Sequence, residues 1–208
     1  MFPLNVPNVL TVLRILLVPV LVVALTTETK NGDTLAAIVF ALAAITDGLD
    51  GYIARSRKSI TTFGKVMDPI ADKMLITAAL VALVSLDRLA AWVAMVIIAR
   101  EFAVSSLRVA AAAEGAIIPA SILGKIKTVI QIAAVMALIA ANDPHATWVD
   151  VLVGLMVAAT VASGVDYFLN VRREIEAARE NLRAQRMTAR SGADTSRSSS
   201  SSREVPRT

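Results

Sequence analysis

The feature that most constrains this chain is a series of long apolar stretches that take up most of its first 171 residues. A transmembrane α-helix needs about 20 mostly apolar residues to cross the hydrocarbon core of a bilayer. Six stretches meet or nearly meet this length, and short polar connections with turn-forming Asn-Gly and Asp-Pro pairs separate them. They are residues 8–25, 35–54, 69–86, 89–112, 118–141 and 147–171. The sequence therefore predicts an all-α integral membrane protein with six transmembrane helices.

The composition agrees with a membrane-embedded chain and excludes several kinds of catalytic site. Only 18% of the 208 residues are charged, whereas an ordinary soluble domain has about 25% and needs them to cover its surface. The chain has no cysteine and a single histidine, His145. These counts exclude disulfides, thiolate metal sites and cysteine nucleophiles, and they argue against a zinc site held by histidines or a Ser-His-Asp triad.

The distribution of basic residues predicts the orientation of the helices, because Lys and Arg are enriched in cytoplasmic loops. An even number of spans places both chain termini on one side, and that side receives most of the basic loop residues and the Arg-rich C-terminal tail. The connections on the other side contain only Lys30 and Arg88, together with several acidic residues. Both termini are therefore expected to be cytoplasmic, in a multi-pass protein of a bacterial-type cytoplasmic (inner) membrane.

The excess positive charge lies in the C-terminal tail and not in the membrane domain. The formal net charge is +4; residues 172–208 carry nine Arg and five acidic residues, whereas residues 1–171 carry 12 basic and 12 acidic residues. We expect a membrane domain at 1–171, a charged juxtamembrane helical extension at 172–190 and a disordered Ser- and Arg-rich tail at 191–208. A neutral domain gives no reason to expect nucleic-acid binding. The tail is expected to be a solvated appendage or to attract anionic membrane lipids.

Ionisable residues inside the predicted spans indicate function, since each costs roughly 2.5–3.5 kcal/mol on insertion scales. At a rise of about 1.5 Å per residue, most of them fall in the cytoplasmic half of the bilayer, with Arg100 and Glu101 nearer the midplane. This clustering predicts a polar cavity that faces the cytoplasm. A transporter, the alternative to an enzyme, needs a polar route to both faces, and the clustering argues against it. The ionisable residues inside the predicted spans are Arg14, Asp47, Asp50, Asp68, Asp72, Lys73, Arg100, Glu101, Arg108, Lys125, Lys127 and Asp166.

Four of these residues are aspartates whose spacing predicts a metal site. Asp47 and Asp50 are three residues apart on one predicted helix, and Asp68 and Asp72 are four apart on the next, so each pair shares a helix face. Four neighbouring carboxylates need cations between them, and oxygen ligands suit Mg²⁺ or Mn²⁺. Two such ions can stabilise the attacking and leaving oxygens of a phosphoryl displacement. The alternative is a set of structural salt bridges with nearby basic residues: Arg55, Lys65 and Lys73.

The segment from Asp47 to Asp72 also resembles a known family signature. It matches D-x-x-D-G-x-x-A-R-x8-G-x3-D-x3-D at every specified position, and this pattern is similar to that of the CDP-alcohol phosphatidyltransferases. The resemblance implies transfer of a phosphatidyl group from a CDP-linked lipid, CDP-diacylglycerol, to an alcohol, with release of CMP. It also implies that all four aspartates bind two Mg²⁺ or Mn²⁺ ions and that Asp72 is the general base. A homodimer would be in keeping with the family.

The same resemblance implies which residues bind the CDP-linked lipid. Arg55 is expected near the pyrophosphate, where a guanidinium can bind phosphate oxygens. Asn8, Thr11 and Arg14 of the first span are expected to complete the nucleotide site, although a helix N-cap is an equally good interpretation of Asn8. The remaining predicted contacts lie within the signature: Gly51, Ala54, Thr61 and Gly64.

The second half of the chain indicates the acceptor alcohol. Its intramembrane basic residues outnumber the acidic ones, which suits a dianionic phosphate on the acceptor. Snorkelling at helix ends is the alternative for the two lysines and for Arg100. The residues expected to bind that phosphate are Arg100, Arg108, Lys125 and Lys127. Residues 63–73, 99–101 and 124–128, together with Arg108, are most similar to the corresponding segments of family members that use sn-glycerol 3-phosphate, which we expect to be the acceptor. A cardiolipin synthase of the same family, with phosphatidylglycerol as acceptor, is the second possibility, and an enzyme that uses an inositol phosphate is the third.

Overall fold

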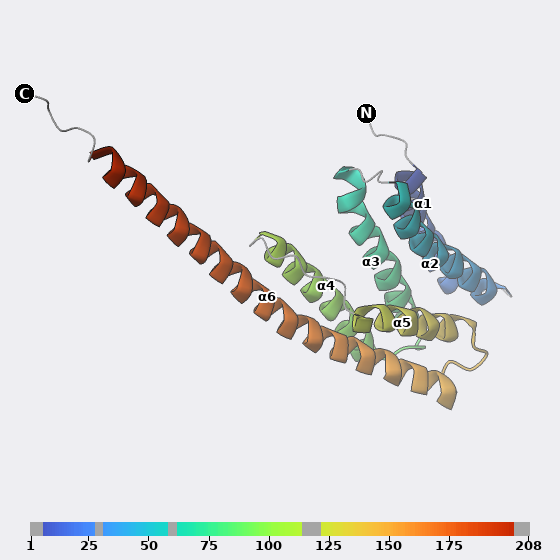
Figure 1. Ribbon diagram of the computed structural model, residues 1–208. Coiled ribbons are helices and arrows are strands. Elements are labelled where there is room, and N and C mark those ends of the chain that lie inside the picture. Colours follow the sequence, from blue (N-terminus) through green and yellow to red (C-terminus); the bar gives the residue numbers. More distant parts are fainter. Residues whose placement is uncertain (1–5, 28–30, 58–61, 114–121, 202–208) are drawn as a thin grey trace, which may run out of the picture. The chain divides into compact units, whose positions relative to one another are not determined.

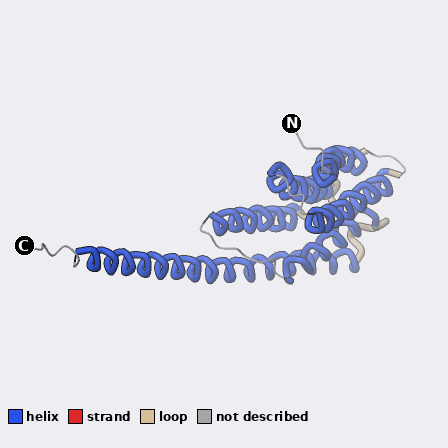
Figure 2. The backbone as a smooth tube through the Cα atoms, turned by 45° about the horizontal axis from the view of Figure 1, so that its top comes forward, coloured by secondary structure: helices blue, strands red, loops and turns tan. Residues whose placement is uncertain are grey.

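The computed structural model describes residues 6–27, 31–57, 62–113 and 122–201, and side chains for residues 9, 11–27, 31–46, 70–71, 73–112, 122–174 and 176. Helices joined by short loops make up this part of the chain, and no strand occurs in it (Figures 1 and 2). The helices are α1 (Val6–Thr26), α2 (Gly32–Arg57), α3 (Thr62–Ser85), α4 (Ala91–Ala113), α5 (Ile122–Ala140) and α6 (Thr147–Ser201). Each predicted apolar stretch overlaps one helix, and the predicted all-α class is confirmed for the described residues.

The loop between α3 and α4 shows how one of these helices ends. Asp87 has a φ of 55°, and the amides of Asp87 and Arg88 donate to the carbonyls of Val84 at 3.1 Å and Leu83 at 2.9 Å. This is the hydrogen-bond pattern of a Schellman cap, which satisfies the last carbonyls of a helix and requires one residue in the left-handed conformation. Aspartate adopts that conformation more readily than most other non-glycine residues, so α3 ends here without a glycine.

Arg88, the next residue, joins three segments of the chain. Its Nη2 donates to the Asp33 carboxylate at 2.8 Å, and its Nη1 donates to the Ile139 carbonyl at 3.3 Å. Asp33 lies in the first turn of α2, where the helix dipole favours a carboxylate. Ile139 lies in the last turn of α5, where carbonyls have no partner within the helix. The guanidinium therefore ties the α3–α4 loop to the start of α2 and the end of α5.

The chain forms two compact units. One comprises Met1–Phe102 and Ser121–Gly164, and the other comprises Ala103–Ala120 and Val165–Thr208. The helices α4 and α6 begin in the first unit and end in the second. The second unit has a small buried cluster of its own, formed by side chains of α4 and α6. In this unit α6 continues past the predicted domain boundaries at 171 and 190 as far as Ser201.

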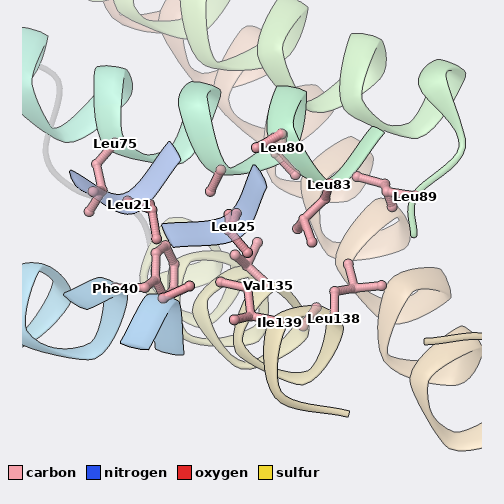
Figure 3. Close-up of a cluster of buried hydrophobic side chains, with 14 of the residues drawn as sticks. Leu21, Leu25, Phe40, Leu75, Leu80, Leu83, Leu89, Val135, Leu138 and Ile139 are labelled. Atoms are coloured by element: carbon pink, nitrogen blue, oxygen red, sulfur yellow. The ribbon is translucent and has the colours of Figure 1, made fainter. Parts of the chain in front are cut away.

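The core of the first unit lies where α1 packs against both α2 and α3 and where α5 contacts α2 and α3. Figure 3 shows Leu21 of α1 and Phe40 of α2 next to each other, with Val135 and Ile139 of α5 close by. All four side chains are fully buried. In a bilayer such contacts stabilise mainly through close packing, because lipid tails are as apolar as leucine. The core therefore fixes the positions of the helices that carry the polar residues described below.

The outward faces of the helices are also apolar. Leu16 and Val23 of α1, Met95 of α4 and Val129 of α5 are each 60–70% exposed. Helices that are apolar on both their buried and their exposed faces are typical of a lipid environment. Among the described residues, two stretches are long and apolar enough to cross a membrane, and shorter apolar stretches lie in α1, α2 and α3. The two long stretches are Ile122–Ala140 and Thr147–Glu174.

Candidate active site

The aspartate motif lies on two helices with continuous backbones. Asp47 and Asp50 belong to α2, and Asp68 and Asp72 belong to α3, so the predicted spacings of three and four residues are spacings along a helix. Their side chains lie outside the described residues. The same holds for six predicted CDP-lipid contacts: Asn8, Gly51, Ala54, Arg55, Thr61 and Gly64.

The donor set itself fits the predicted ions. The four aspartates supply only hard carboxylate oxygens, which Mg²⁺ and Mn²⁺ prefer, and the two helices that carry them both pack against α1. Among the side chains that the structure describes, no group of three or more His, Cys, Asp or Glu could hold a metal ion. The metal site at Asp47, Asp50, Asp68 and Asp72 stays a prediction, supported by the helical spacing.

Two of the predicted CDP-lipid residues have described side chains, and both are buried. Thr11 and Arg14 lie three residues apart on α1, with 0% and 1% exposure. A buried guanidinium is costly unless negative charge and hydrogen-bond acceptors surround it. Because α1 packs against both motif helices, Arg14 lies on the helix best placed to offer a cation to a ligand there.

A cluster of partly buried charges in the first unit is centred on Glu101 of α4. The ammonium group of Lys127 on α5 and the guanidinium of Arg100 both donate to the Oε1 of Glu101, the latter at 3.1 Å. Arg100 also donates through Nη2 to the Ser163 hydroxyl of α6 at 2.9 Å, and that hydroxyl donates to the Thr160 carbonyl at 3.1 Å. We call Arg100, Glu101, Lys127 and Ser163 the Glu101 cluster. It links three helices through charge-assisted hydrogen bonds, which are stronger than neutral ones.

Gly164 makes room for one member of the Glu101 cluster. A Cβ atom at this position would lie 3.3 Å from the Cγ and 3.6 Å from the Nε of Arg100. The stem of Arg100 therefore passes directly over the backbone of α6. Glycine permits this close approach because it has no side chain.

A cavity of about 70 Å³ lies beside the Glu101 cluster, entirely within the first unit. Its charged lining residues, among those described, are two cations and one anion: Lys73, Lys127 and Glu101. Thr128 and Gln131 of α5 add polar groups, and the rest of the wall is mainly apolar side chains of α2, α3, α4 and α5. The described part of the wall therefore offers both charged and neutral hydrogen-bonding groups to a small polar ligand.

The cavity lies close to both segments of the aspartate motif. Lys73, on its wall, directly follows Asp72 in α3, and Ala44, also on its wall, precedes Asp47 by three residues in α2. Three residues are less than one turn of an α-helix. A ligand in this cavity is therefore within one helical turn of the predicted metal ligands on each helix.

The four residues predicted to bind the acceptor phosphate have different surroundings. Lys127 is 5% exposed and lines the cavity, and Arg100 is joined to it through Glu101. Lys125 is exposed. Arg108 belongs to the second unit, where its guanidinium lies 5.6 Å from the centre of the Tyr167 ring and its Nε is 3.5 Å from the Tyr167 hydroxyl. The structure thus brings Arg100 and Lys127 together and gives Arg108 an aromatic partner.

Some polar residues of this site were not singled out from the sequence. Gln131 follows Lys127 by four residues, so the spacing was a local signal that both side chains share one face of α5. The contact of Ser163 with Arg100 joins residues 63 positions apart and has no local signature. Glu101 stood out only as a nearby acid, whereas the structure makes it the shared partner of two cations.

Comparison with known proteins defines the class of this protein. A model of the family described as CDP-alcohol phosphatidyltransferase matches residues 4–164. The chain belongs to the CDP-alcohol phosphatidyltransferase family, a family of enzymes. The resemblance that the aspartate signature predicts is therefore confirmed.

Several relatives are similar to this chain over most of both sequences. The CDP-diacylglycerol–glycerol-3-phosphate 3-phosphatidyltransferase of Bacillus subtilis (strain 168) is 41% identical over 180 residues, which cover 79% of this chain and 93% of that protein. A protein of the same name from Rickettsia felis is 40% identical over 169 residues, with the same coverage of 79% and 93%. A probable phosphatidylglycerophosphate synthase of Mycobacterium tuberculosis is 38% identical over 180 residues, covering 85% of this chain and 86% of that protein.

Proposed function

We propose that this protein transfers a phosphatidyl group from CDP-diacylglycerol to sn-glycerol 3-phosphate, forming phosphatidylglycerophosphate and CMP. The observation that carries the proposal is the similarity, over most of both chains, to relatives whose names state this activity. The complete aspartate signature supports the phosphatidyl transfer. The cationic cavity beside it supports an acceptor with a phosphate group.

In the proposed reaction, Asp72 accepts the proton of the acceptor hydroxyl while the hydroxyl oxygen attacks the phosphorus of the phosphatidyl group. A new bond joins that oxygen to phosphorus, the bond from phosphorus to the CMP oxygen breaks, and CMP leaves. Two Mg²⁺ or Mn²⁺ ions, when bound by Asp47, Asp50, Asp68 and Asp72, supply the positive charge that acidifies the hydroxyl and stabilises the leaving phosphate. The chain's own task is to hold the two substrates in line for this displacement.

The two substrates are held by different groups of cations. We place the CDP pyrophosphate near Arg55 and Arg14, with Asn8, Thr11, Gly51, Ala54, Thr61 and Gly64 completing that site. On the acceptor side, Lys127 is the best placed of the four candidates because it is buried and lines the cavity. Arg100 adds positive charge behind Glu101, and Arg108 and Lys125 remain candidates for the acceptor phosphate. This division follows charge complementarity between guanidinium or ammonium groups and phosphates.

We also propose six spans, with both termini and the active site facing the cytoplasm, in a bacterial-type cytoplasmic membrane. The basic residues of the predicted cytoplasmic loops and the Arg-rich tail support this orientation, and the apolar exposed faces of the helices support contact with membrane lipids. A homodimer is in keeping with the family.

CMP release by the purified protein tests the proposed reaction. CDP-diacylglycerol is supplied with Mg²⁺ or Mn²⁺, and sn-glycerol 3-phosphate, an inositol phosphate and phosphatidylglycerol are offered in turn. We expect CMP release with sn-glycerol 3-phosphate. Release with none of the three would contradict phosphatidyl transfer, and a preference for phosphatidylglycerol would instead assign the protein as a cardiolipin synthase.

The substitution Asp72→Asn tests the assignment of the general base. An amide cannot accept the proton, so we expect turnover to fall by roughly 10²–10⁴-fold, while the protein still inserts and folds. Asp33→Asn is the matched control, because Asp33 lies at the opposite end of α2 from the motif and should keep its activity. Near-normal turnover by Asp72→Asn would show that another group takes the proton.

A further inference from the structure

Gln131 is a buried amide whose Nε2 has no hydrogen-bond partner among the residues that the structure describes. Its side chain lies on α5 and is 3% exposed. A buried donor that lacks a partner costs about 1–3 kcal/mol, and native proteins leave few such groups unpaired. This amide nitrogen is therefore a candidate for pairing with a ligand.

The position of Gln131 indicates where that ligand lies. The residue lines the 70 Å³ cavity, one helical turn beyond Lys127 on the same face of α5. The Lys127 ammonium already donates to Glu101, and the neighbouring Thr128 hydroxyl donates to the Gly124 carbonyl at 3.0 Å. The Gln131 side chain thus brings an amide donor without a partner to the wall of a cavity in which Lys127 and Thr128 donate elsewhere.

The chemistry of a neutral amide donor favours a hydroxyl group over a phosphate. Anions bind best to charged donors, which Lys73 and Lys127 supply in this cavity. A hydroxyl oxygen can accept from an amide N–H while its proton is donated elsewhere. The volume of about 70 Å³ also suits a short polyol, because one water molecule needs only about 10–15 Å³ in the same measure.

We propose that Gln131 binds the central, unreactive hydroxyl of the acceptor and so helps to select a glycerol phosphate. The inference rests on the proposed function, in which sn-glycerol 3-phosphate reacts through its terminal hydroxyl and offers its phosphate to the lysines. The Nε2 of Gln131 donates to the oxygen of the remaining hydroxyl, and no bond at that carbon is made or broken. Gln131 is therefore a specificity-determining residue of the acceptor site, adjacent to the phosphate-binding cations.

The test compares two acceptors that differ only in this hydroxyl: sn-glycerol 3-phosphate and 3-hydroxypropyl phosphate. In the wild-type protein we expect kcat/KM to be roughly tenfold higher for sn-glycerol 3-phosphate, the size of one ordinary hydrogen bond. In Gln131→Met the ratio of the two kcat/KM values should fall to about 1, mainly because kcat/KM for sn-glycerol 3-phosphate decreases. Because the readout is a ratio within one variant, a partial loss of folded protein does not change it.

Thr160→Val is the matched control. Thr160 is fully buried, and its Oγ1 also has no hydrogen-bond partner among the described residues, but it does not line the cavity. Its removal should leave the tenfold preference unchanged. If Gln131→Met does not fold, Gln131→Leu replaces it, because an apolar side chain makes no hydrogen bond with the hydroxyl.

Each outcome decides between the two levels of the proposal. A variant at Gln131 that keeps the full preference overturns the inference and leaves the proposed function standing. A folded variant that is inactive with both acceptors also overturns it, because loss of one hydroxyl contact leaves turnover of the analogue intact. If the wild-type protein turns over neither of the two acceptors, the proposed function itself is contradicted.

Discussion

Two groups of charged residues in the first unit each contain an arginine, but they differ in how many basic side chains share one carboxylate. Arg88 pairs with one carboxylate, Asp33, and its other nitrogen donates to the carbonyl of Ile139 at a helix end. In the Glu101 cluster, Arg100 shares its carboxylate with Lys127, so two cations surround one anion. The first group is balanced and its side chains are 20% and 47% exposed, whereas the side chains of the second are 6–18% exposed.

This difference in burial and in charge distinguishes a structural ion pair, Arg88 with Asp33, from the Glu101 cluster beside the candidate active site. A balanced pair near the surface holds helix ends together and contributes about 0–1 kcal/mol. Charges withdrawn from water are costly unless groups of opposite charge and hydrogen-bond partners surround them. The Glu101 cluster, which contributes Glu101 and Lys127 to the cavity wall, is therefore the part of the first unit that we assign to the candidate site.

The largest effect should come from removing the anion at the centre of the Glu101 cluster. In Glu101→Ala, Lys127 and Arg100 lose their shared carboxylate, and we expect a loss of about 3 kcal/mol in stability together with loss of activity. Thermal unfolding in detergent and CMP release measure the two effects. The double variant Glu101→Met with Lys127→Met should regain part of the lost stability, because Lys127 no longer lacks a partner while Arg100 keeps Ser163, yet it should stay inactive. Recovery of activity would show that the pair is only structural.

An intermediate effect should come from crowding the arginine of the same cluster. In Gly164→Ala the new methyl group meets Arg100 at 3.3 Å, so the side chain must shift, and we expect a cost of about 1 kcal/mol and a severalfold increase in KM for the acceptor. Gly154→Ala is the control on the same helix, because nothing lies within 4 Å of its added Cβ. It should be neutral or slightly stabilising, since alanine favours helix over glycine. Equal effects at both glycines would show that Arg100 does not depend on its close approach to the backbone of α6 at Gly164.

The smallest effect should come from breaking the balanced pair. Arg88→Ala and Asp33→Ala, combined in a double-mutant cycle, should give a coupling energy of about 0.5 kcal/mol after allowance for solvent screening, with CMP release unchanged. Thermal unfolding of the four proteins in detergent provides the measurement. A coupling as large as the effect of Glu101→Ala, or a loss of activity, would remove the contrast between the two groups.

The helices and the family could be predicted from the sequence because both depend on patterns that are local in the chain. Apolar runs located all six helices, and the stretch predicted at 89–112 differs from α4 by at most two residues at either end. The aspartate signature spans 26 residues, and its spacing specified the family that comparison confirms. The acceptor site was less predictable, because charge alone grouped Arg100, Arg108, Lys125 and Lys127 together.

The sequence by itself determined an all-α, lipid-compatible chain of the CDP-alcohol phosphatidyltransferase family, since hydrophobic length and residue spacing are properties of single segments. The tertiary structure decided which charges meet. Glu101 binds Lys127 across 26 residues, Arg100 binds Ser163 across 63, and Arg88 binds Asp33 across 55. These contacts depend on how separate helices pack, which no local pattern records. The packing also placed Gln131 at the cavity wall, and the proposed selection of the acceptor follows from that position.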